Sequence, residues 1–140
     1  MGQAGSGETV LAVEDEESVR SLVRIVLEGA GFNVLEASGA REALYMHENH
    51  PGAIDLLLTD IVLSGKSGRE IAKEFLELRP GIRVIYMSGY TDDVLMRAEL
   101  EKTQARFLGK PFTSEALIRM VRAALGASPA AQPASDPVRR

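Results

Sequence analysis

Five short apolar runs alternate with amphipathic segments along this chain, and the alternation limits the fold more than any other feature. The runs are four to six residues long and rich in Val, Ile and Leu, which is typical of β-strands. Several are almost continuously apolar, as expected where helices cover both faces of a parallel sheet. Strands are predicted at residues 9–13, 33–37, 54–59, 83–88 and 106–109. The chain is therefore predicted to be a doubly wound α/β domain.

The segments between these runs carry apolar residues at spacings of three and four, the pattern of helices that bury one face. Ser38 is a candidate N-cap for the second helix, and Thr113 or Ser114 for the last. The apolar stripe is thinnest in the segment 91–101. Helices are predicted at about 19–29, 38–48, 68–79, 91–101 and 114–125.

Composition separates one central domain from two tails. Residues 1–8 are Gly-rich and residues 127–140 are dominated by Ala, Pro and Ser, so neither buries enough apolar surface to offset its ordering entropy. We expect disordered tails there and a single domain over 9–126. A net charge of −4 argues against direct nucleic-acid binding. The absence of cysteine, of a signal-like start and of a membrane-length apolar run predicts a cytoplasmic protein without a membrane partner.

Polar residues follow four of the predicted strands, where ligands of open parallel sheets bind. They are Glu14 and Asp15 after the first, Asp60 after the third, Ser88 at the end of the fourth and Lys110 after the fifth. If the first strand lies between the second and the third, the three acids converge. Such crowding disfavours their ionisation unless a cation compensates, and an all-oxygen ligand set points to Mg²⁺.

A carboxylate facing a divalent cation, an ammonium and a hydroxyl suits phosphoryl transfer. An aspartate has an ordinary pKa of about 3.9, so Asp60 is expected to be ionised at pH 7 and to need no general base as a nucleophile. Mg²⁺ and Lys110 would neutralise the oxygens of the transferred group. Each residue also has a structural explanation: acids favour helix starts, Lys110 could be solvated, and Ser88 could serve a turn. Their joint placement at strand ends favours the functional interpretation.

The segments VLAVEDEE, LLLTDIVLSGKSG, VIYMSGYTDD and FLGKPF together resemble the receiver domain of two-component response regulators, over about residues 8–126. The sequences of these segments are most similar to receivers fused to hybrid sensor histidine kinases. The resemblance implies a flavodoxin-like sheet of five strands in the order 2-1-3-4-5 with five helices. It also implies a phosphorylated signalling domain rather than an enzyme.

The resemblance implies a role for each site residue. Asp60 corresponds to the acceptor of a phosphoryl group from a histidine kinase or histidine phosphotransferase. Glu14, Asp15, Asp60 and the carbonyl of Val62 correspond to the Mg²⁺ ligands, and Ser88 and Lys110 to the groups that bind the phosphoryl oxygens. Phe107 corresponds to the switch aromatic on the helix 4–strand 5–helix 5 face, where a downstream protein would bind; alternatively, it is a core aromatic.

The sequence departs from the common pattern of the family in two places. Glu14 stands where many receivers have aspartate, and it reaches one methylene further. Leu63-Ser64 replaces the usual Met-Pro, which removes a rigid proline from the loop.

Other functions remain as alternatives. The triplet Gly65-Lys66-Ser67 matches the end of a nucleotide-binding P-loop, but Asp60 occupies the position of the first glycine, where an acid would repel phosphate. A haloacid-dehalogenase-type phosphatase would need a second acid where Val62 stands. The more serious alternative is a receiver-like interaction module that is not phosphorylated.

Overall fold

A parallel five-stranded sheet forms the centre of the protein, in a computed structural model that describes residues 7–63, 65–89, 98, 102 and 105–126. The strand order is β2-β1-β3-β4-β5, which confirms the predicted α/β fold and its order. The strands are β1 (Thr9–Val13), β2 (Asn33–Ala37), β3 (Leu56–Asp60), β4 (Arg83–Ser88) and β5 (Arg106–Gly109). The helices are α1 (Glu17–Gly29), α2 (Ala40–Asn49), α3 (Gly68–Leu78) and α5 (Ser114–Gly126).

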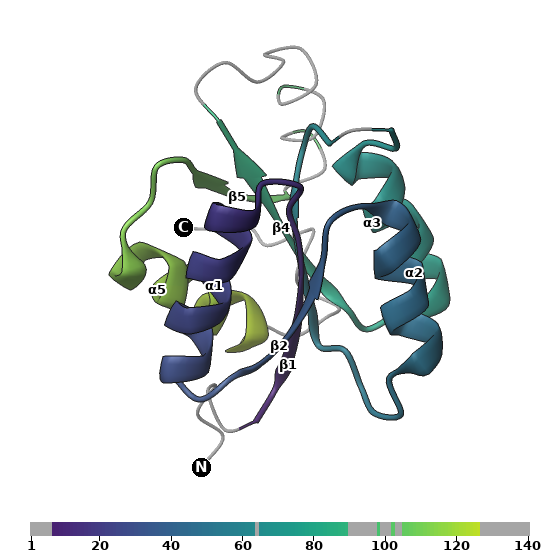
Figure 1. Cartoon of the computed structure of the whole chain (residues 1–140), viewed down its shortest axis with the longest axis horizontal. Helices are drawn as coiled ribbons and strands as arrows, with labels where there is room; N and C mark the ends of the chain where they lie inside the picture. The colour runs from purple at the N-terminus through teal and green to yellow at the C-terminus, as the bar shows by residue number, and fades with distance from the viewer. Residues whose placement is uncertain (1–6, 64, 90–97, 99–101, 103–104, 127–140) are drawn as a thin grey trace.

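The helices cover both faces of the sheet, α1 and α5 on one side and α2 and α3 on the other (Figure 1). Alternate residues of β1 supply the two cores: Val10 packs in the core that includes Leu27 of α1, and Leu11 in the core that includes Phe75 of α3. All five residues of β1 are buried. Because helices cover both faces, a ligand would approach the sheet at the carboxyl ends of its strands.

The observed element ends differ slightly from the predictions. Strand β3 begins at Leu56 rather than at residue 54. The Asp55 carboxylate just before it accepts the Thr9 N–H at 2.8 Å. The strand also extends to Asp60, which makes the acid the last residue of the strand. Helix α2 is capped by Gly39 rather than Ser38, whose N–H donates to the Glu42 carboxylate at 2.7 Å.

The start of α5 matches its prediction: the Thr113 hydroxyl accepts the Ala116 N–H at 3.0 Å. The helix predicted over 91–101 lies almost wholly outside the described residues. So do most of the two predicted tails, although Gly7 donates a backbone hydrogen bond to Gly31 and Glu8 accepts one from Asn33. Within the described segments, no helix has both the length and the apolar character needed to cross a bilayer.

Candidate functional site

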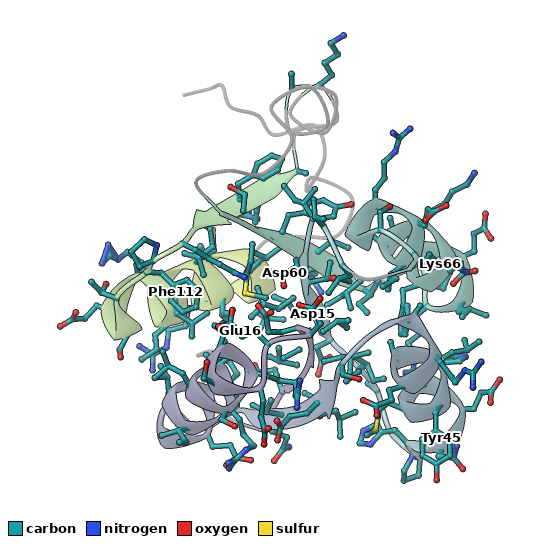
Figure 2. The ribbon with its side chains drawn as sticks, turned by 45° about the horizontal axis from the view of Figure 1, so that its top comes forward. Asp15, Glu16, Tyr45, Asp60, Lys66 and Phe112 are labelled. Atoms are coloured by element: carbon teal, nitrogen blue, oxygen red, sulfur yellow. The ribbon has the colours of Figure 1, made fainter. Side chains whose placement is uncertain are left out.

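Strands β1, β3, β4 and β5 place the predicted site residues at one edge of the sheet. The neighbouring pairings of β1 with β3, β3 with β4 and β4 with β5 are all parallel, so their carboxyl ends meet there. Figure 2 shows Asp15 and Asp60 close together at this edge, whereas Lys66 lies on the outer side of the molecule. The predicted convergence is therefore present in the structure.

Three acids form the centre of this site. Carboxylate oxygens of Glu14, Asp15 and Asp60 all lie within 4.8 Å of one another. Glu14 and Asp60 are only 1% and 4% exposed, whereas Asp15 is exposed. Two nearly buried carboxyl groups and one accessible carboxylate, all oxygen donors, fit a hard divalent cation such as Mg²⁺.

Lys110 joins two of these acids across the sheet. Its ammonium nitrogen lies 2.7 Å from Asp60 Oδ1 and 2.8 Å from Glu14 Oε1. Its backbone N–H donates to the Ser88 carbonyl at 2.9 Å, which fixes the start of the β5–α5 loop against the end of β4. One ammonium thus serves two carboxyl groups, and the interpretation of Lys110 as a merely solvated lysine is wrong.

Burial changes the ionisation of this group of side chains. It raises the pKa of Asp60 to about 8, and the neighbouring Glu14 carboxyl adds to the effect against the opposing influence of Lys110. Burial disfavours the charged form of Lys110 as well, but its bonds to Asp60 and Glu14 prevail and raise its pKa. In the protein alone, Asp60 is therefore not simply ionised at pH 7 as its ordinary pKa suggested. A cation bound beside it would favour the ionised carboxylate of Asp60.

This shift predicts how stability depends on pH without divalent cations. Asp60 releases its proton near its ordinary value of 3.8 in the unfolded chain but near 8 in the folded protein. Between these values the folded state holds the extra proton, so the free energy of unfolding should fall as the pH rises. In Asp60→Asn the fall between about pH 5 and 8 should be smaller by about 3 kcal/mol, since each pH unit between the two pKa values contributes about 1.4 kcal/mol. Urea unfolding in EDTA measures both curves, and parallel curves would contradict the prediction.

The loop that carries the GKS triplet is built as a helix cap. Gly65 has φ +84°, and the Ser67 hydroxyl and the Glu70 carboxylate form a capping box at the start of α3. Lys66 turns outward to pair with Glu74 at 2.8 Å. Ser67 and Lys66 are thus occupied by contacts of α3, and the P-loop interpretation loses its two key side chains.

Gly68 brings α3 against the site. Its N–H donates to the Ile61 carbonyl at 2.9 Å, and a Cβ at this position would overlap the carbonyl oxygen of Asp60 and lie 2.9 Å from its carbonyl carbon. Only a residue without a side chain permits this approach. This approach could not be predicted from the sequence, because it depends on the distance between Gly68 and a backbone carbonyl of β3.

The remaining predicted residues have defined positions, but their roles stay predictions. Ser88 is buried at the end of β4, and its own carbonyl accepts the Lys110 backbone N–H. Val62, whose carbonyl was predicted to bind Mg²⁺, is 50% exposed two residues after Asp60. The Phe107 ring is partly buried and lies 5.8 Å from the Tyr86 ring, centre to centre. This contact is compatible with the switch role and with the core role.

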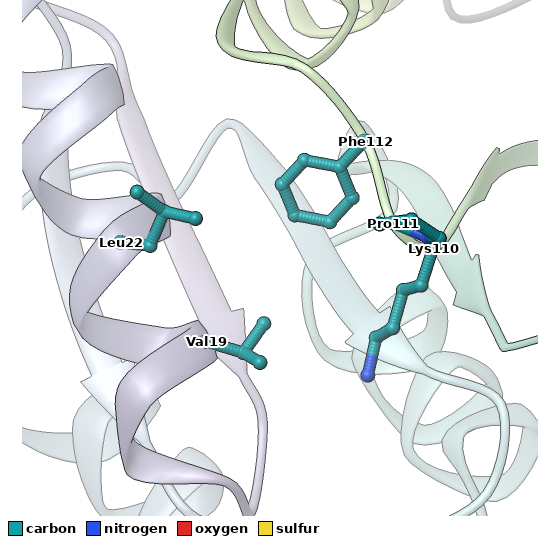
Figure 3. Close-up of a pocket in the computed structure, with 5 residues that line it drawn as sticks. All are labelled: Val19, Leu22, Lys110, Pro111 and Phe112. Atoms are coloured by element: carbon teal, nitrogen blue, oxygen red, sulfur yellow. The ribbon is translucent and has the colours of Figure 1, made fainter.

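An apolar groove of about 280 Å³ opens beside the site (Figure 3). Val19 and Leu22 of α1 form one wall, and Lys110, Pro111 and Phe112 form the other. Sequence analysis missed this groove because the two walls come from opposite ends of the chain. It places apolar surface next to Lys110.

Comparisons with known proteins agree with this geometry. The response regulator receiver domain family matches residues 10–122. The sensor kinase CckA of Brucella abortus (strain 2308) is 34% identical over 114 residues, which are 81% of this chain and 12% of that protein. The transcriptional regulatory protein FixJ of Azorhizobium caulinodans is 33% identical over 119 residues, covering 85% and 56%. The chain thus spans just over half of one relative and a small part of the other.

Solved structures show the same fold. A response regulator receiver protein from Sinorhizobium medicae WSM419 has 31% identity and a TM-score of 0.76, with 86% of this chain and 96% of that chain covered. The receiver domain of the hybrid histidine kinase CckA has 31% identity and a TM-score of 0.70, with 84% and 98% covered. Sequence match, strand order and strand-end residues agree, and the chain belongs to the family of response regulator receiver domains.

Proposed function

We propose that this receiver domain accepts a phosphoryl group on Asp60 from a phosphohistidine of a histidine kinase or histidine phosphotransferase, and signals through the resulting conformational change. The observation that carries the proposal is the placement of Asp60. Its carboxyl group is nearly buried, lies 2.7 Å from the Lys110 ammonium, and shares a 4.8 Å cluster with Glu14 and Asp15. The domain is itself the phosphorylated component and not a stand-alone enzyme.

The reaction needs little from the protein beyond position and charge. An oxygen of the ionised Asp60 carboxylate attacks phosphorus, the phosphorus–nitrogen bond of the phosphohistidine breaks, and the departing imidazole takes up a proton. Mg²⁺, when bound by Glu14, Asp15, Asp60 and the Val62 carbonyl, would offset the negative charge of the phosphoryl oxygens.

Two further groups at the strand ends would hold the product. Lys110 is already directed at Asp60, so its ammonium can move from the carboxylate to a phosphoryl oxygen. Ser88 lies at the same edge and has a hydroxyl to donate. We propose that these new bonds pull on β4 and β5 and thereby reach Phe107, which contacts Tyr86 of β4 across the two strands. A downstream protein would bind the surface of α5, β5 and the segment 91–101, the last of which lies largely outside the described residues.

Labelling with acetyl phosphate and Mg²⁺, followed by intact-mass measurement, tests the proposal. We expect the mass of one added phosphoryl group in the wild-type chain and none in Asp60→Asn, since the amide cannot act as the acceptor. Adding EDTA should also abolish the gain. Asp55→Asn is a matched control, because Asp55 precedes the opposite end of β3 and should leave labelling unchanged. A wild-type chain that gains no mass would instead support an unphosphorylated interaction module.

A further inference from the structure

We infer that Arg20 is a positioning residue that holds the loop between β1 and α1 in the shape required for cation binding. The inference deepens the proposed function, on which it rests for the identity of the ligand. Nothing in the sequence drew attention to Arg20, which lies on α1 outside the group of strand-end residues. Its contacts connect the acidic loop, α1 and β2.

The first contact is with the loop itself. Arg20 Nη1 donates to the Glu14 carbonyl at 2.7 Å. That carbonyl and the N–H of Asp15 belong to the same planar peptide unit. The bond to Arg20 therefore fixes the orientation of the peptide plane between Glu14 and Asp15. Glu14 and Asp15 are two of the three acids of the cluster. Arg20 therefore acts on the direction of both carboxylates without touching either.

The second contact holds Arg20 in place. Its Nε lies 3.4 Å from Glu36 Oε1, and its side chain is only 17% exposed. Glu36 is in β2, directly opposite Ala12 of β1. The sheet therefore holds the Glu36 backbone in place next to the β1–α1 loop. A guanidinium can serve the carbonyl and the carboxylate at once through separate N–H groups. A lysine ammonium lacks this planar fork, so Arg20→Lys would keep the charge but lose the geometry.

Two further hydrogen bonds hold the β1–α1 loop in the same conformation. The Glu14 N–H donates to the Ala37 carbonyl at 3.0 Å, and the Glu14 carboxylate accepts the Glu16 N–H at 2.9 Å. The second bond leaves Glu14 Oε1 directed at Lys110. A rotation of the Glu14 carbonyl away from Arg20 would disturb this arrangement. Mg²⁺ tolerates little distortion of its ligands, so such a change should show in its affinity.

Arg24 provides the matched control. It lies one turn further along α1 and pairs with the same Glu36 at 2.9 Å, and with Glu28 at 3.4 Å. Both arginines bring positive charge near the acids, which by itself would weaken cation binding. Removing charge alone should thus tighten binding, whereas removing the positioning bond should weaken it.

Isothermal titration of the full chain with Mg²⁺ tests the inference. We expect Arg20→Gln and Arg20→Lys each to raise the dissociation constant about 10-fold or more. The dissociation constant of Arg24→Gln should remain within about twofold of wild type. That of Glu36→Gln should be intermediate, because Arg20 keeps its bond to the Glu14 carbonyl but loses its ion pair with Glu36. Circular dichroism in EDTA checks that each variant is folded.

The outcomes separate the inference from the proposed function. If Arg20→Gln and Arg20→Lys bind Mg²⁺ as tightly as wild type, or if Arg24→Gln weakens binding equally, Arg20 is not a positioning residue. If the predicted order of affinities holds but Asp60 accepts no phosphoryl group, the inference stands and the proposed function fails. A wild-type chain that binds no Mg²⁺ would overturn both.

Discussion

Replacing Lys110 by methionine should slow phosphoryl uptake from acetyl phosphate by about 10²- to 10³-fold, the usual cost of removing one group that stabilises developing charge. Methionine keeps the length and apolar stem of the side chain but removes the ammonium that lies 2.7 Å from Asp60 and 2.8 Å from Glu14. The two carboxyl groups then lose the ammonium that lies between them, and the phosphoryl oxygens lose a cation that would face them. The labelling rate in saturating Mg²⁺, followed by intact mass, measures the effect.

Lys66→Met is the control for that experiment. Lys66 belongs to the triplet that resembles a P-loop, yet its ammonium pairs with Glu74 on the outer side of α3. We expect the labelling rate to stay within about twofold of wild type, since an exposed ion pair contributes little. Equal losses in both variants would mean that the loop after β3 carries phosphate-binding chemistry after all.

The second large effect is expected at Gly68. A single added methyl group in Gly68→Ala would collide with the backbone carbonyl of Asp60, a residue that is paired with Met87 of β4 in the sheet. The β3–α3 connection must shift, and we expect the free energy of unfolding to fall by about 3 kcal/mol. Urea unfolding measures the loss. Phosphoryl uptake should fall as well, because the displaced carbonyl belongs to Asp60, the proposed acceptor.

Gly29→Ala shows what the same substitution does without the collision. Gly29 is the last residue of α1, and a Cβ there would meet no atom within 4 Å. Alanine favours helix by roughly 0.5–1 kcal/mol over glycine, so this variant should be neutral or slightly more stable. If the two variants have the same urea midpoint, the close approach of α3 to Asp60 is not a stability determinant.

The fold could be predicted because the apolar patterns of the strands and helices alternate along the chain as a parallel α/β sheet requires. Parallel strands bring their carboxyl ends to one edge, so Asp60 and Lys110 could be assigned to one site although 50 residues separate them in the sequence. The ionisation of Asp60 could not be predicted, because its raised pKa results from burial and from the distance to Glu14. Neither quantity exists before the sheet is assembled.

Other features escaped prediction because they depend on backbone contacts. Gly68 is essential only through its distance to a carbonyl of β3, and Arg20 through its bond to a carbonyl of the β1–α1 loop. Side-chain patterns carry no signal for such contacts. Ser67 shows that a side-chain pattern can also suggest a site that is absent. It caps α3, although its residue type and spacing match those of a phosphate-binding serine.

The bond between Lys110 and Glu14 joins residues that are 96 positions apart, at the ends of the last and the first strand. The acids of β1 and β3 therefore gain their protein cation only when the sheet has been completed across its full width. A chain interrupted before β5 would retain Asp60 but lack the ammonium that lies beside it. Under the proposed function, unfinished or clipped copies should therefore take up a phosphoryl group poorly, because Lys110 is missing from their site.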